Sequence, residues 1–430
     1  MLKGVNVPHR KHTKGMVPAK MPAPALLFFS AIQHIGAPAK PVVKVGDQVK
    51  VGTMLMEAGG YVSSPVYSSV SGKVKKIEDM LQSNGSYATC VVVENDGEMT
   101  VDESIAPPVV NDYDSFIAAV KASGIVGIGG AGFPTFVKLD VKDTSRIEAV
   151  VINGAECEPY ITSDSVTMEH NSEDISYGIE LLRKYLGVKR IIIGIEKNKP
   201  EAIKSMREMA KAHGGAVEVA VLPSVYPQGG EKVLVYHTLG KVIEEGMLPI
   251  DVGVLVLNCT TVAKIAEYVK TGMPLVEKCV TVDGSAVNKP QNVLVAVGTP
   301  AKDVFDFCGG FKSEPAKVIY GGPMMGVSVD SMDVPVLKQT NALLAFDAKD
   351  AKPKKTTACI RCGRCTNACP FGLAPVAIEK ALMQEDVAAL EALKANLCME
   401  CGCCSFICPA ARPLVQQNKM AKALLKGGKK

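Results

Sequence analysis

Apolar and polar residues alternate along much of the first hundred residues. The stretch 42–55 (VVKVGDQVKVGTML) is interrupted by Gly46 and Gly52, and the stretch 62–77 (VSSPVYSSVSGKVKKI) repeats this style. Alternation with a period of two residues, broken by glycine, is typical of short strands joined by tight turns. We therefore expect residues 1–106 to form an all-β domain.

The pattern changes after Pro107 and Pro108, which indicate a linker. Beyond it, short apolar runs alternate with segments in which apolar residues recur at helical spacing. The expected strands are 146–152, 190–195, 217–222 and 252–257, and the expected helices are 114–123, 176–186, 201–212, 232–239 and 262–271. Strands that alternate with helices predict a mainly parallel sheet covered on both faces. This Rossmann-like α/β domain is expected to span residues 107–272.

Short strands with glycine and proline turns return over residues 273–346, which favours a small β-grasp (SLBB-like) domain. These expected strands are 279–283, 293–297 and 317–320. The last region, 347–430, has apolar residues at helical spacing at 376–397 and 413–425, and we expect it to be mainly helical. The sequence thus predicts a multidomain α/β protein.

Eight of the 14 cysteines fall into two runs in this last region, each with the spacing C-x2-C-x2-C-x3-C-P. The first run is Cys359, Cys362, Cys365, Cys369 and Pro370, and the second is Cys398, Cys401, Cys404, Cys408 and Pro409. This spacing is that of a ferredoxin-type pair of 4Fe–4S clusters, in which the fourth cysteine of a run ligates the partner cluster. The expected ligand sets are Cys359, Cys362, Cys365 and Cys408 for one cluster, and Cys398, Cys401, Cys404 and Cys369 for the other.

Other uses of cysteine fit this pattern less well. A zinc site needs four ligands in two pairs, not two runs of four followed by proline. A disulfide framework belongs to small secreted proteins, and the six remaining cysteines are scattered, which favours a reducing compartment. Cys403 lies inside the second run and competes with Cys404 in register, but the two-residue spacing favours Cys404.

Composition excludes several classes of function. A net charge of +4 over 430 residues is too small to indicate nucleic-acid binding. No apolar run reaches 18 residues; the run at 26–32 (LLFFSAI) is too short to span a bilayer, and no signal peptide is expected before it. Residues 351–430 hold 13 Lys and Arg against 5 Asp and Glu. This surplus of positive charge partly offsets the negative charge of the clusters. It also suits an acidic redox partner or an anionic membrane surface. The alternative is a solvated basic tail without a partner.

A glycine-rich segment, GIVGIGGAGFPT at 124–135, opens the α/β domain. It contains a formal G-x-G-x-x-G that starts at Gly127, although a dinucleotide fingerprint follows a strand and this one follows an expected helix. Its glycines let backbone N–H groups close on an anion, and a helix beginning within 133–139 would point its N-terminus there. Lys138 is long enough to reach the same phosphate. The alternative is a glycine-rich turn without a ligand.

Polar clusters follow two of the expected strands. NGAECEP (153–159) comes directly after the strand that ends at Ile152, and NCTT (258–261) comes after the strand that ends at Leu257. A third cluster, YPQGGE (226–231), adds an aromatic face and a carboxylate. Because parallel strands present their carboxyl ends at one edge of a sheet, these clusters are expected to converge there. Each alone is typical of a surface loop; together they predict a ligand site.

Three of these segments, GIVGIGGAGFPTFVKL (124–139), NGAECEP and YPQGGE, resemble the FMN- and NADH-binding subunit of respiratory complex I. The order of the whole chain is similar to the RnfC family, the C subunits of the Rnf ion-translocating ferredoxin:NAD oxidoreductases. QHIGAPAKPVVKVGDQVKVG (33–52) and YGGPMMG (320–326) resemble that family too. The first domain resembles the barrel-sandwich hybrid of lipoyl and biotinyl carriers, but the place of its modified lysine holds EAGGY (57–61). A docking scaffold is therefore expected there.

The resemblance, which covers essentially the full length, implies a set of cofactor contacts. Gly127, Gly129, Gly130 and Lys138 would hold the FMN phosphate and ribityl chain, Asn153, Glu156 and Asn258 would line the flavin, and Phe133, Glu158 and Glu231 would face the nicotinamide nucleotide, with Tyr226 adding an aromatic face. Three positions depart from the complex I pattern. Its arginine is Ile128 here, one of its glutamates is Gly230, and the second of its paired asparagines is Cys259.

The function that the resemblance implies is NADH-side electron entry into a membrane-bound, ion-translocating ferredoxin:NAD oxidoreductase. Electrons would pass between NAD(H), non-covalent FMN and two 4Fe–4S clusters, and the chain would supply no catalytic acid or base. The implied partners are membrane subunits of an Rnf-type complex, an iron–sulfur subunit and, indirectly, ferredoxin, at the cytoplasmic face of the membrane. Related alternatives are a cobalamin reductase and an electron-transfer protein of proline reductase systems. An alternative of another class is an electron relay and docking module without flavin.

Overall fold

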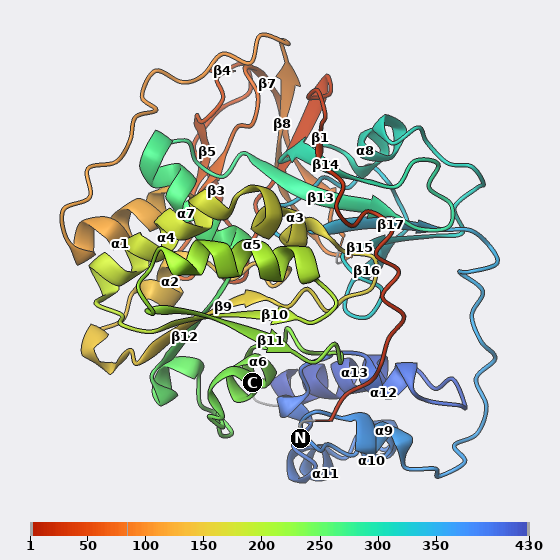
Figure 1. Cartoon of the computed structure of the whole chain (residues 1–430). Helices are drawn as coiled ribbons and strands as arrows, with labels where there is room; N and C mark the ends of the chain where they lie inside the picture. Colours follow the sequence, from red (N-terminus) through yellow and green to blue (C-terminus); the bar gives the residue numbers. More distant parts are fainter. Residues whose placement is uncertain (1–2, 84, 428–430) are drawn as a thin grey trace.

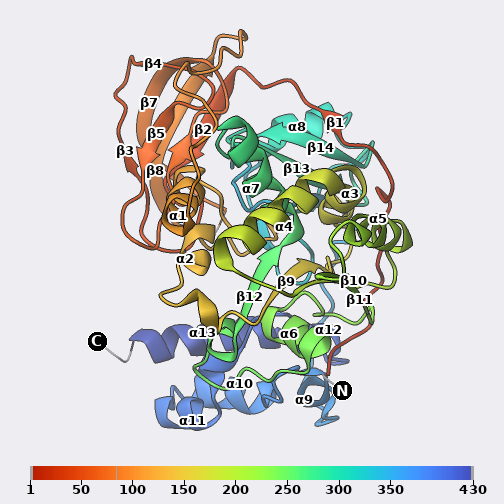
Figure 2. The same ribbon diagram turned by 60° about the vertical axis from the view of Figure 1, so that its left-hand side comes forward.

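The computed structural model of the chain describes residues 3–83 and 85–427. Four groups of elements follow one another along the sequence and pack together (Figure 1 and Figure 2). In Figure 1 the β-rich N-terminal part lies at the top, the α/β part in the middle, a mixed sheet at the right and a helical C-terminal part at the bottom. Within the described residues, no helix is both long and apolar enough to cross a membrane.

Two small antiparallel sheets form the N-terminal domain, with strand orders β2-β8-β7-β4 and β3-β5-β6. Their strands are β2 (Leu26–Ser30), β3 (Lys40–Pro41), β4 (Gln48–Val49), β5 (Met54–Glu57), β6 (Val66–Tyr67), β7 (Gly72–Leu81) and β8 (Tyr87–Asn95). Leu27, Phe29, Leu55, Val91 and Val93 are fully buried in the core that the two sheets share. The alternating pattern therefore predicted a β-rich domain correctly.

The segment that holds the modified lysine in lipoyl carriers makes a domain contact here. Tyr61 donates a hydrogen bond to Asp140 Oδ2 over 2.6 Å, and its ring meets Phe136 edge-on at 5.7 Å. Both partners lie just after the glycine-rich segment of the next domain. The segment 57–61 thus docks the first domain against the second, in line with a scaffold.

The α/β domain contains four parallel strands in the order β11-β10-β9-β12. The strands are β9 (Ala149–Gly154), β10 (Ile191–Glu196), β11 (Val217–Leu222) and β12 (Val254–Asn258). The helices are α1 (Tyr113–Ala122), α2 (Thr135–Leu139), α3 (Ser163–His170), α4 (Ser172–Leu186), α5 (Pro200–Lys211), α6 (Glu231–Leu239) and α7 (Cys259–Thr271). Of these, α3 was not expected, because its segment has no amphipathic pattern.

Helices cover both faces of this sheet, as the alternation of strands and helices predicted. Val150 and Ile152 of β9 pack into the core beneath α1, α4, α5 and α7. Val151, which points the other way, packs with Leu234 and Val235 of α6. Figure 1 shows α4 and α5 above the sheet and α6 below it.

The mixed six-stranded sheet has the order β1-β14-β13-β17-β15-β16. Its elements are β1 (Ala19–Lys20), β13 (Glu277–Asp283), β14 (Gln291–Ala296), β15 (Lys317–Tyr320), β16 (Val327–Val329) and β17 (Ala342–Phe346), with α8 (Ala301–Phe307) beside them. The three strands expected from the sequence are present. However, β1 pairs in parallel with β14, although it precedes the first domain in sequence. We call residues 3–18, which lead to β1, the N-terminal strap; they form the red trace that rises from the C-terminal domain in Figures 1 and 2.

The C-terminal domain is helical, as expected. Its helices are α9 (Arg364–Ala368), α10 (Pro375–Met383), α11 (Val387–Ala392), α12 (Cys403–Phe406) and α13 (Leu414–Gly427). Positive φ angles recur at matching positions of the two cysteine runs: Arg361 and Glu400, Gly363 and Gly402, and Gly372 and Ala411. The two runs therefore follow the same loop conformation, as expected of two copies of one cluster-binding unit.

Lys338 is buried where three domains meet. Its amino group donates hydrogen bonds to the carbonyl oxygens of Pro65 and Gly124, and to the hydroxyl of Ser64 over 3.1 Å. Burial lowers the pKa of this lysine to about 7, whereas an unfolded lysine has a pKa of about 10.4. Between these values the unfolded chain binds the additional proton, so this lysine makes the free energy of unfolding rise with pH.

We expect the variant K338M to lose this pH dependence. It also leaves the buried Pro65 carbonyl without its donor, whereas Gly124 O keeps the Ser64 hydroxyl as a donor. The Tm of K338M should therefore lie below that of the wild type at pH 7. Between pH 7 and pH 10, the wild-type Tm should rise relative to that of K338M. Thermal unfolding at both pH values, with K349M as an exposed control, measures the difference. A Tm of K338M that follows the wild type at both pH values would contradict the expectation.

Candidate functional site

The strand order of the parallel sheet reverses between β9 and β12. From β9 the chain proceeds to β10 and β11 on one side, whereas β12 is added on the other. Open α/β sheets bind their ligands at the carboxyl ends of strands that flank such a switch point. Asn153 and Asn258 are register partners at these two ends. The structure thus brings together the two asparagines that the sequence assigned to a flavin.

Asn258 is held rigidly at this edge. Its Oδ1 accepts a hydrogen bond from Thr261 N over 3.1 Å and so caps α7, while its Nδ2 donates to Asp164 Oδ2 over 2.8 Å. A Cβ on Gly129 would lie only 2.9 Å from that Nδ2. The glycine-rich segment therefore rests directly on Asn258, and glycine is required at this approach.

The glycine-rich segment closes on itself. Gly127 N donates to Phe133 O over 2.8 Å, and Gly132 N donates to Gly127 O over 3.0 Å. Gly130 and Gly132 have φ angles of 115° and 67°, which favour glycine. As the sequence indicated, the segment follows a helix, α1, so it is not the usual strand–turn–helix fingerprint. It forms a tight loop set against the carboxyl edge of the sheet.

Hydrogen bonds join the other two clusters at the same edge. Asn153 Nδ2 donates to Gly229 O over 3.0 Å, and Gly229 N donates to Cys157 Sγ over 3.3 Å. Tyr226, at the start of YPQGGE, is buried. The expected convergence of NGAECEP, YPQGGE and Asn258 is therefore present.

The two glutamates of NGAECEP bind backbone amides. Glu156 accepts from Asp164 N over 2.7 Å and from the Ser165 hydroxyl, and so caps α3. Glu158 accepts from Met324 N and Met325 N over 3.0 and 2.8 Å, which ties it to the YGGPMMG segment. Burial raises the pKa of Glu158 to about 7, against the lowering effect of these two amides.

Lys138 and Glu231 form an ion pair. The Lys138 amino group lies 2.7 Å from Glu231 Oε1 and donates to Val256 O over 3.2 Å. Both side chains are about one-third exposed. Two of the three N–H donors of Lys138 are engaged in this way, so contact with a phosphate would use the third donor or replace Glu231.

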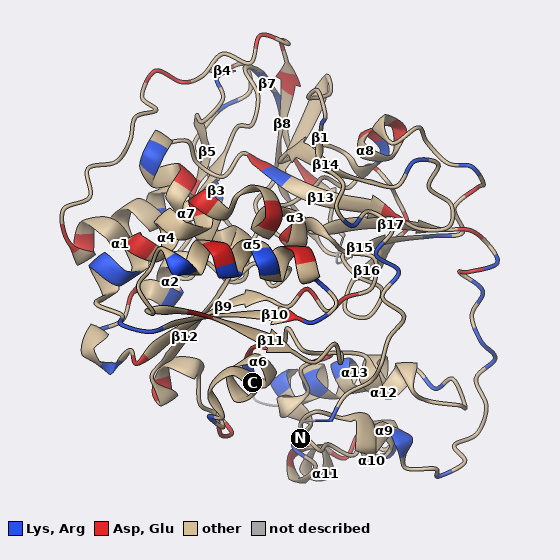
Figure 3. Cartoon of the chain, viewed as in Figure 1, with Lys and Arg blue, Asp and Glu red and all other residues tan. Residues whose placement is uncertain are grey.

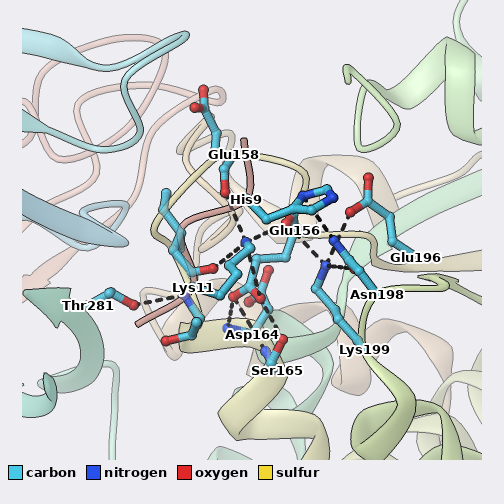
Figure 4. A network of polar contacts seen from close by, with 12 residues as sticks. His9, Lys11, Glu156, Glu158, Asp164, Ser165, Glu196, Asn198, Lys199 and Thr281 are labelled. Carbon is cyan, nitrogen blue, oxygen red and sulfur yellow. Dashed lines mark hydrogen bonds and ion pairs between the residues drawn. The ribbon is translucent and has the colours of Figure 1, made fainter. Parts of the chain in front are cut away.

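Three charged residues that are buried or half-buried at this edge were missed by sequence reasoning. Asp164 accepts hydrogen bonds from Asn258 and Thr260, and its pKa is raised by burial and by the neighbouring Glu156 carboxylate. Lys199 donates to Ala155 O over 2.6 Å, and Lys11 binds the same turn from the N-terminal strap (Figure 4). Single charged residues outside any motif give no local signal, so only the folded chain identifies them.

Two departures from the complex I pattern lie in tight contacts. Ile128 is 3% exposed in the core of the α/β domain, and its N–H donates to Thr261 Oγ1 over 3.1 Å. A Cβ on Gly230 would lie 2.5 Å from Cε of Met399, which stands between two cysteines of the second run. Glycine at this position therefore accommodates the close approach of the C-terminal domain.

The electrostatic neighbours of the cysteines follow the crossed ligand sets. Burial, followed by the thiolates of Cys398, Cys401 and Cys369, raises the pKa of Cys404 to about 12, which places these four sulfurs near one another. The pKa of Arg412 is raised first by its hydrogen bonds to Glu379, and further by Cys359 and Cys408. Cys359 of the first run and Cys408 of the second run thus both lie near Arg412. These neighbours support the proposed crossing of the fourth cysteines.

Amide groups also point at the sulfurs. Arg361 N lies 3.4 Å from Cys359 Sγ, and both Glu400 N and Asn418 Nδ2 lie 3.4 Å from Cys398 Sγ. Such N–H···S contacts favour thiolate ligands and tune cluster potentials. Among the described residues, no group of three or more His, Cys, Asp or Glu side chains has the arrangement of a metal-ion site. The ligand sets therefore remain a prediction from spacing and neighbours.

Cys403 has hydrogen-bond partners both inside and outside its run, and one of them is Cys401. Its Sγ donates to the carbonyl oxygen of Tyr226 over 3.7 Å, and it packs with Val5 and Val7 of the strap. The contact with Tyr226 places the second run directly against the YPQGGE segment. The prediction of Cys404 as the ligand rests on the two-residue spacing.

Models of four known families match successive parts of the chain. The RnfC barrel sandwich hybrid domain matches residues 1–98, and the Nuo51 FMN-binding domain matches residues 120–267. The SLBB domain matches residues 279–328, and the 4Fe-4S dicluster domain matches residues 352–416.

Two curated relatives cover most of the chain. The C subunit of the Na+-translocating ferredoxin:NAD+ oxidoreductase complex of Acetobacterium woodii is 42% identical over 379 residues, which cover 87% of this chain and 85% of that protein. The C subunit of the proton-translocating ferredoxin:NAD+ oxidoreductase complex of Clostridium ljungdahlii is 39% identical over 385 residues, which cover 87% and 83%. This chain belongs to the RnfC family.

The fold of this RnfC-family chain is similar to that of a more distantly related protein of known structure. The crystal structure of an NAD+-reducing NiFe-hydrogenase in the H2-reduced state matches with a TM-score of 0.52 at 19% identity, over 73% of this chain and 63% of that chain. At this identity the likeness concerns the fold alone.

The residues of this RnfC-family chain fit the FMN that its matched domain binds. Beside the glycine-rich loop, Thr135 Oγ1 and Gln339 Oε1 are buried without a hydrogen-bond partner among the described residues. Gln339 packs against Gly132, while a Cβ on Gly127 or Gly130 would have no neighbour nearer than 3.6 Å. Glycine backbone that no side chain covers, next to unpartnered polar atoms, suits a phosphorylated polar ligand. The chain thus carries an FMN-binding domain and a 4Fe–4S dicluster domain.

Proposed function

We propose that this chain is the NADH-side electron-entry subunit of a membrane-bound, Rnf-type ferredoxin:NAD oxidoreductase. The observation that carries the proposal is the convergence of the glycine-rich loop, NGAECEP and YPQGGE at the β9/β12 switch point, beside the second cysteine run. The relatives, named as C subunits of ferredoxin:NAD+ oxidoreductase complexes, support it. In this role the chain exchanges electrons between NAD(H), FMN and two 4Fe–4S clusters.

The proposed work of the chain at the flavin site is to bind and to orient. FMN, when bound, supplies the change between two-electron hydride exchange and single-electron transfer. The loop at Gly127, Gly129 and Gly130 would hold its phosphate and ribityl chain, with the Gly129 and Gly130 amides as donors, because the Gly127 amide already donates to Phe133 O. Lys138 would add its remaining N–H donor.

The remaining predicted contacts divide between flavin and nucleotide. Asn153 and Asn258, which are fixed at adjacent strand ends, would line the flavin, and Glu156 would act indirectly by fixing α3 beside them. Phe133, Glu158 and Glu231 would border the nicotinamide nucleotide, with Tyr226 behind them at the start of YPQGGE. No side chain among these needs to move a proton, because hydride transfer requires no acid or base from the protein.

The position of the second run indicates the order of the two clusters. The Tyr226 carbonyl belongs to YPQGGE and accepts a hydrogen bond from Cys403, beside Cys404. The first run is farther out, since Cys362 is exposed. We infer that one cluster, bound by Cys398, Cys401, Cys404 and Cys369, exchanges electrons with the flavin. The other cluster then faces the partner protein.

The surface around the first run favours an acidic partner. No Asp or Glu occurs between Asp350 and Glu379, whereas Lys352, Lys354, Lys355, Arg361 and Arg364 are all exposed. Ile360, in their midst, is 66% exposed. The linker from β17 to α9 carries several blue segments in Figure 3.

We therefore propose an iron–sulfur partner with an acidic surface at this site, within a complex that includes membrane subunits at the cytoplasmic face. Complementary charges accelerate association at low salt. Electron exchange with an acidic ferredoxin should therefore slow as salt is added. A rate independent of salt would argue against such a partner.

The cofactor content of the anaerobically purified protein tests the proposal at its base. We expect about one FMN and, from two 4Fe clusters, about eight irons per chain. Flavin released by denaturation and iron measured colorimetrically give both values. If protein with full iron retains no flavin and binds no added FMN, the dehydrogenase role fails and the chain is a relay between other proteins.

A further inference from the structure

The N-terminal strap runs past the edge of three domains before it reaches β1. At its start, Val5 exchanges two backbone hydrogen bonds with Tyr226, of 2.9 and 3.0 Å. Farther along, His9 O accepts from Tyr160 N over 2.9 Å, and Asn292 Nδ2 donates to Thr13 O over 3.2 Å. The strap thus touches the YPQGGE segment, the end of the NGAECEP turn and the six-stranded sheet in sequence.

Lys11 occupies the centre of this path. Its ammonium donates to Glu156 O and Glu158 O, both over 2.9 Å, and to Ile161 O. An ammonium group has three N–H donors, so all of them are used on one six-residue turn. The Glu156 carboxylate lies 3.9 Å away, and the Lys11 side chain is only 12% exposed. Figure 4 shows Lys11 surrounded by this turn.

The turn has a conformation that needs support. Glu156 and Tyr160 have φ angles of 47° and 70°, in the left-handed region that non-glycine residues rarely adopt. In addition, three carbonyl oxygens converge on one point, where their partial negative charges repel unless a cation lies between them. Burial lowers the pKa of Lys11 to about 8, and Glu156 counteracts this, so the amine is mainly protonated at pH 7.

The position of the turn determines where Glu158 lies. The carbonyl of Glu158 binds Lys11, and its carboxylate accepts from Met324 N and Met325 N. The same residue therefore joins the strap to the YGGPMMG segment. A displacement of the turn on loss of Lys11 would shift the carboxylate and this segment together.

We propose that Lys11 is a positioning residue, a tethered cation that shapes the turn 156–161 and thereby sets the affinity of the chain for the nicotinamide nucleotide. The inference rests on the proposed function, in which Glu158 borders that nucleotide. Lys11 itself touches no reacting atom.

Hydrogen exchange of the turn tests this without relying on activity. In cluster-loaded K11M, the amides of Cys157, Glu158, Tyr160 and Ile161 should exchange about tenfold faster than in the wild type. The control is K14M, which removes a lysine of the same strap whose ion pair with Glu201, at 2.8 Å, is largely exposed; its turn should exchange as in the wild type. Equal protection of the turn in K11M and the wild type would overturn the inference.

Steady-state kinetics with NADH and ferricyanide separate positioning from general damage. We expect the KM for NADH to rise about tenfold in K11M, with kcat changed less than about twofold and FMN content unchanged. An unchanged KM would overturn the inference. If the wild type does not oxidise NADH at all, the proposed function fails instead, and the exchange experiment still decides whether Lys11 supports the turn.

Chemical rescue with an added amine tests whether the positive charge of Lys11 is what the turn needs. This experiment also applies if K11M does not fold. K11A purified with n-propylamine should regain the protection of the turn and the wild-type KM, because propylammonium replaces the missing side chain. n-Propanol, which has the same shape without the charge, should not rescue. Failure of the amine, or equal rescue by the alcohol, would contradict a role as a tethered cation.

Discussion

Replacing Cys404 by serine is expected to remove one cluster and about half of the iron, whereas C403S should keep both clusters. Cys404 lies near Cys398, Cys401 and Cys369, as its raised pKa reflects. Cys403 instead donates its S–H to the Tyr226 carbonyl, 3.7 Å away. The pair is matched in chemistry and adjacent in sequence, so the difference reports ligand identity alone.

Iron content and the EPR spectrum of the dithionite-reduced protein measure this difference. C404S should show about four irons per chain and the signal of one cluster, without magnetic coupling to a second. C369S should behave in the same way, because the crossed assignment places Cys369 on that cluster. Full iron in C404S together with loss of iron in C403S would reverse the register.

The second large effect is expected at Gly129. In G129A the new Cβ would lie 2.9 Å from Asn258 Nδ2, and this side chain cannot retreat because it caps α7 and binds Asp164. The glycine-rich loop must therefore move away from the sheet edge. We expect FMN to bind about tenfold more weakly or not at all, with full iron and an otherwise folded chain.

G127A, at a second glycine of the predicted FMN site, separates a clash within the chain from contact with the flavin. A Cβ on Gly127 meets no protein atom nearer than 3.6 Å, so it causes no clash within the chain. Loss of FMN in G127A would then report contact with the flavin itself. Fluorescence titration of flavin-depleted protein with FMN gives the affinities. Wild-type FMN affinity in G129A would show that the loop does not hold the cofactor.

The parts of the site that the sequence predicted are those with a local signal. Parallel strands bring their carboxyl ends to one edge, so the polar residues after two apolar runs foretold that Asn153 and Asn258 would meet. Cysteine spacing likewise follows from the shape of a cluster-binding loop. Both arguments need only residues close in sequence, together with a general rule of folding.

The parts that the sequence missed depend on contacts between distant residues. Lys11 binds a turn about 145 residues away, and β1, two residues long, pairs with β14 of the third domain. Lysine is ordinarily exposed, so nothing in the sequence marks Lys11 or Lys338 as buried. The role of Glu156 as the cap of α3 was hidden for the same reason, because α3 has no apolar periodicity.

The departures from the complex I pattern have different physical meanings. Where the complex I pattern has a charged side chain, Ile128 packs into the core of the α/β domain. Its N–H is held by a hydrogen bond to Thr261 Oγ1. Gly230 leaves room for Met399 of the second cysteine run. The first change adds an apolar core contact to the loop, and the second accompanies the approach of the second cysteine run to the YPQGGE segment.

An anaerobic titration of the purified, cluster-loaded protein with NADH tests the central claim most directly. Flavin absorbance and the EPR of the reduced clusters are followed together as NADH is added. Electron entry through this chain predicts that stoichiometric NADH bleaches the flavin and that part of the electrons appears on iron. Flavin that stays oxidised under excess NADH, in protein with intact clusters, would contradict it.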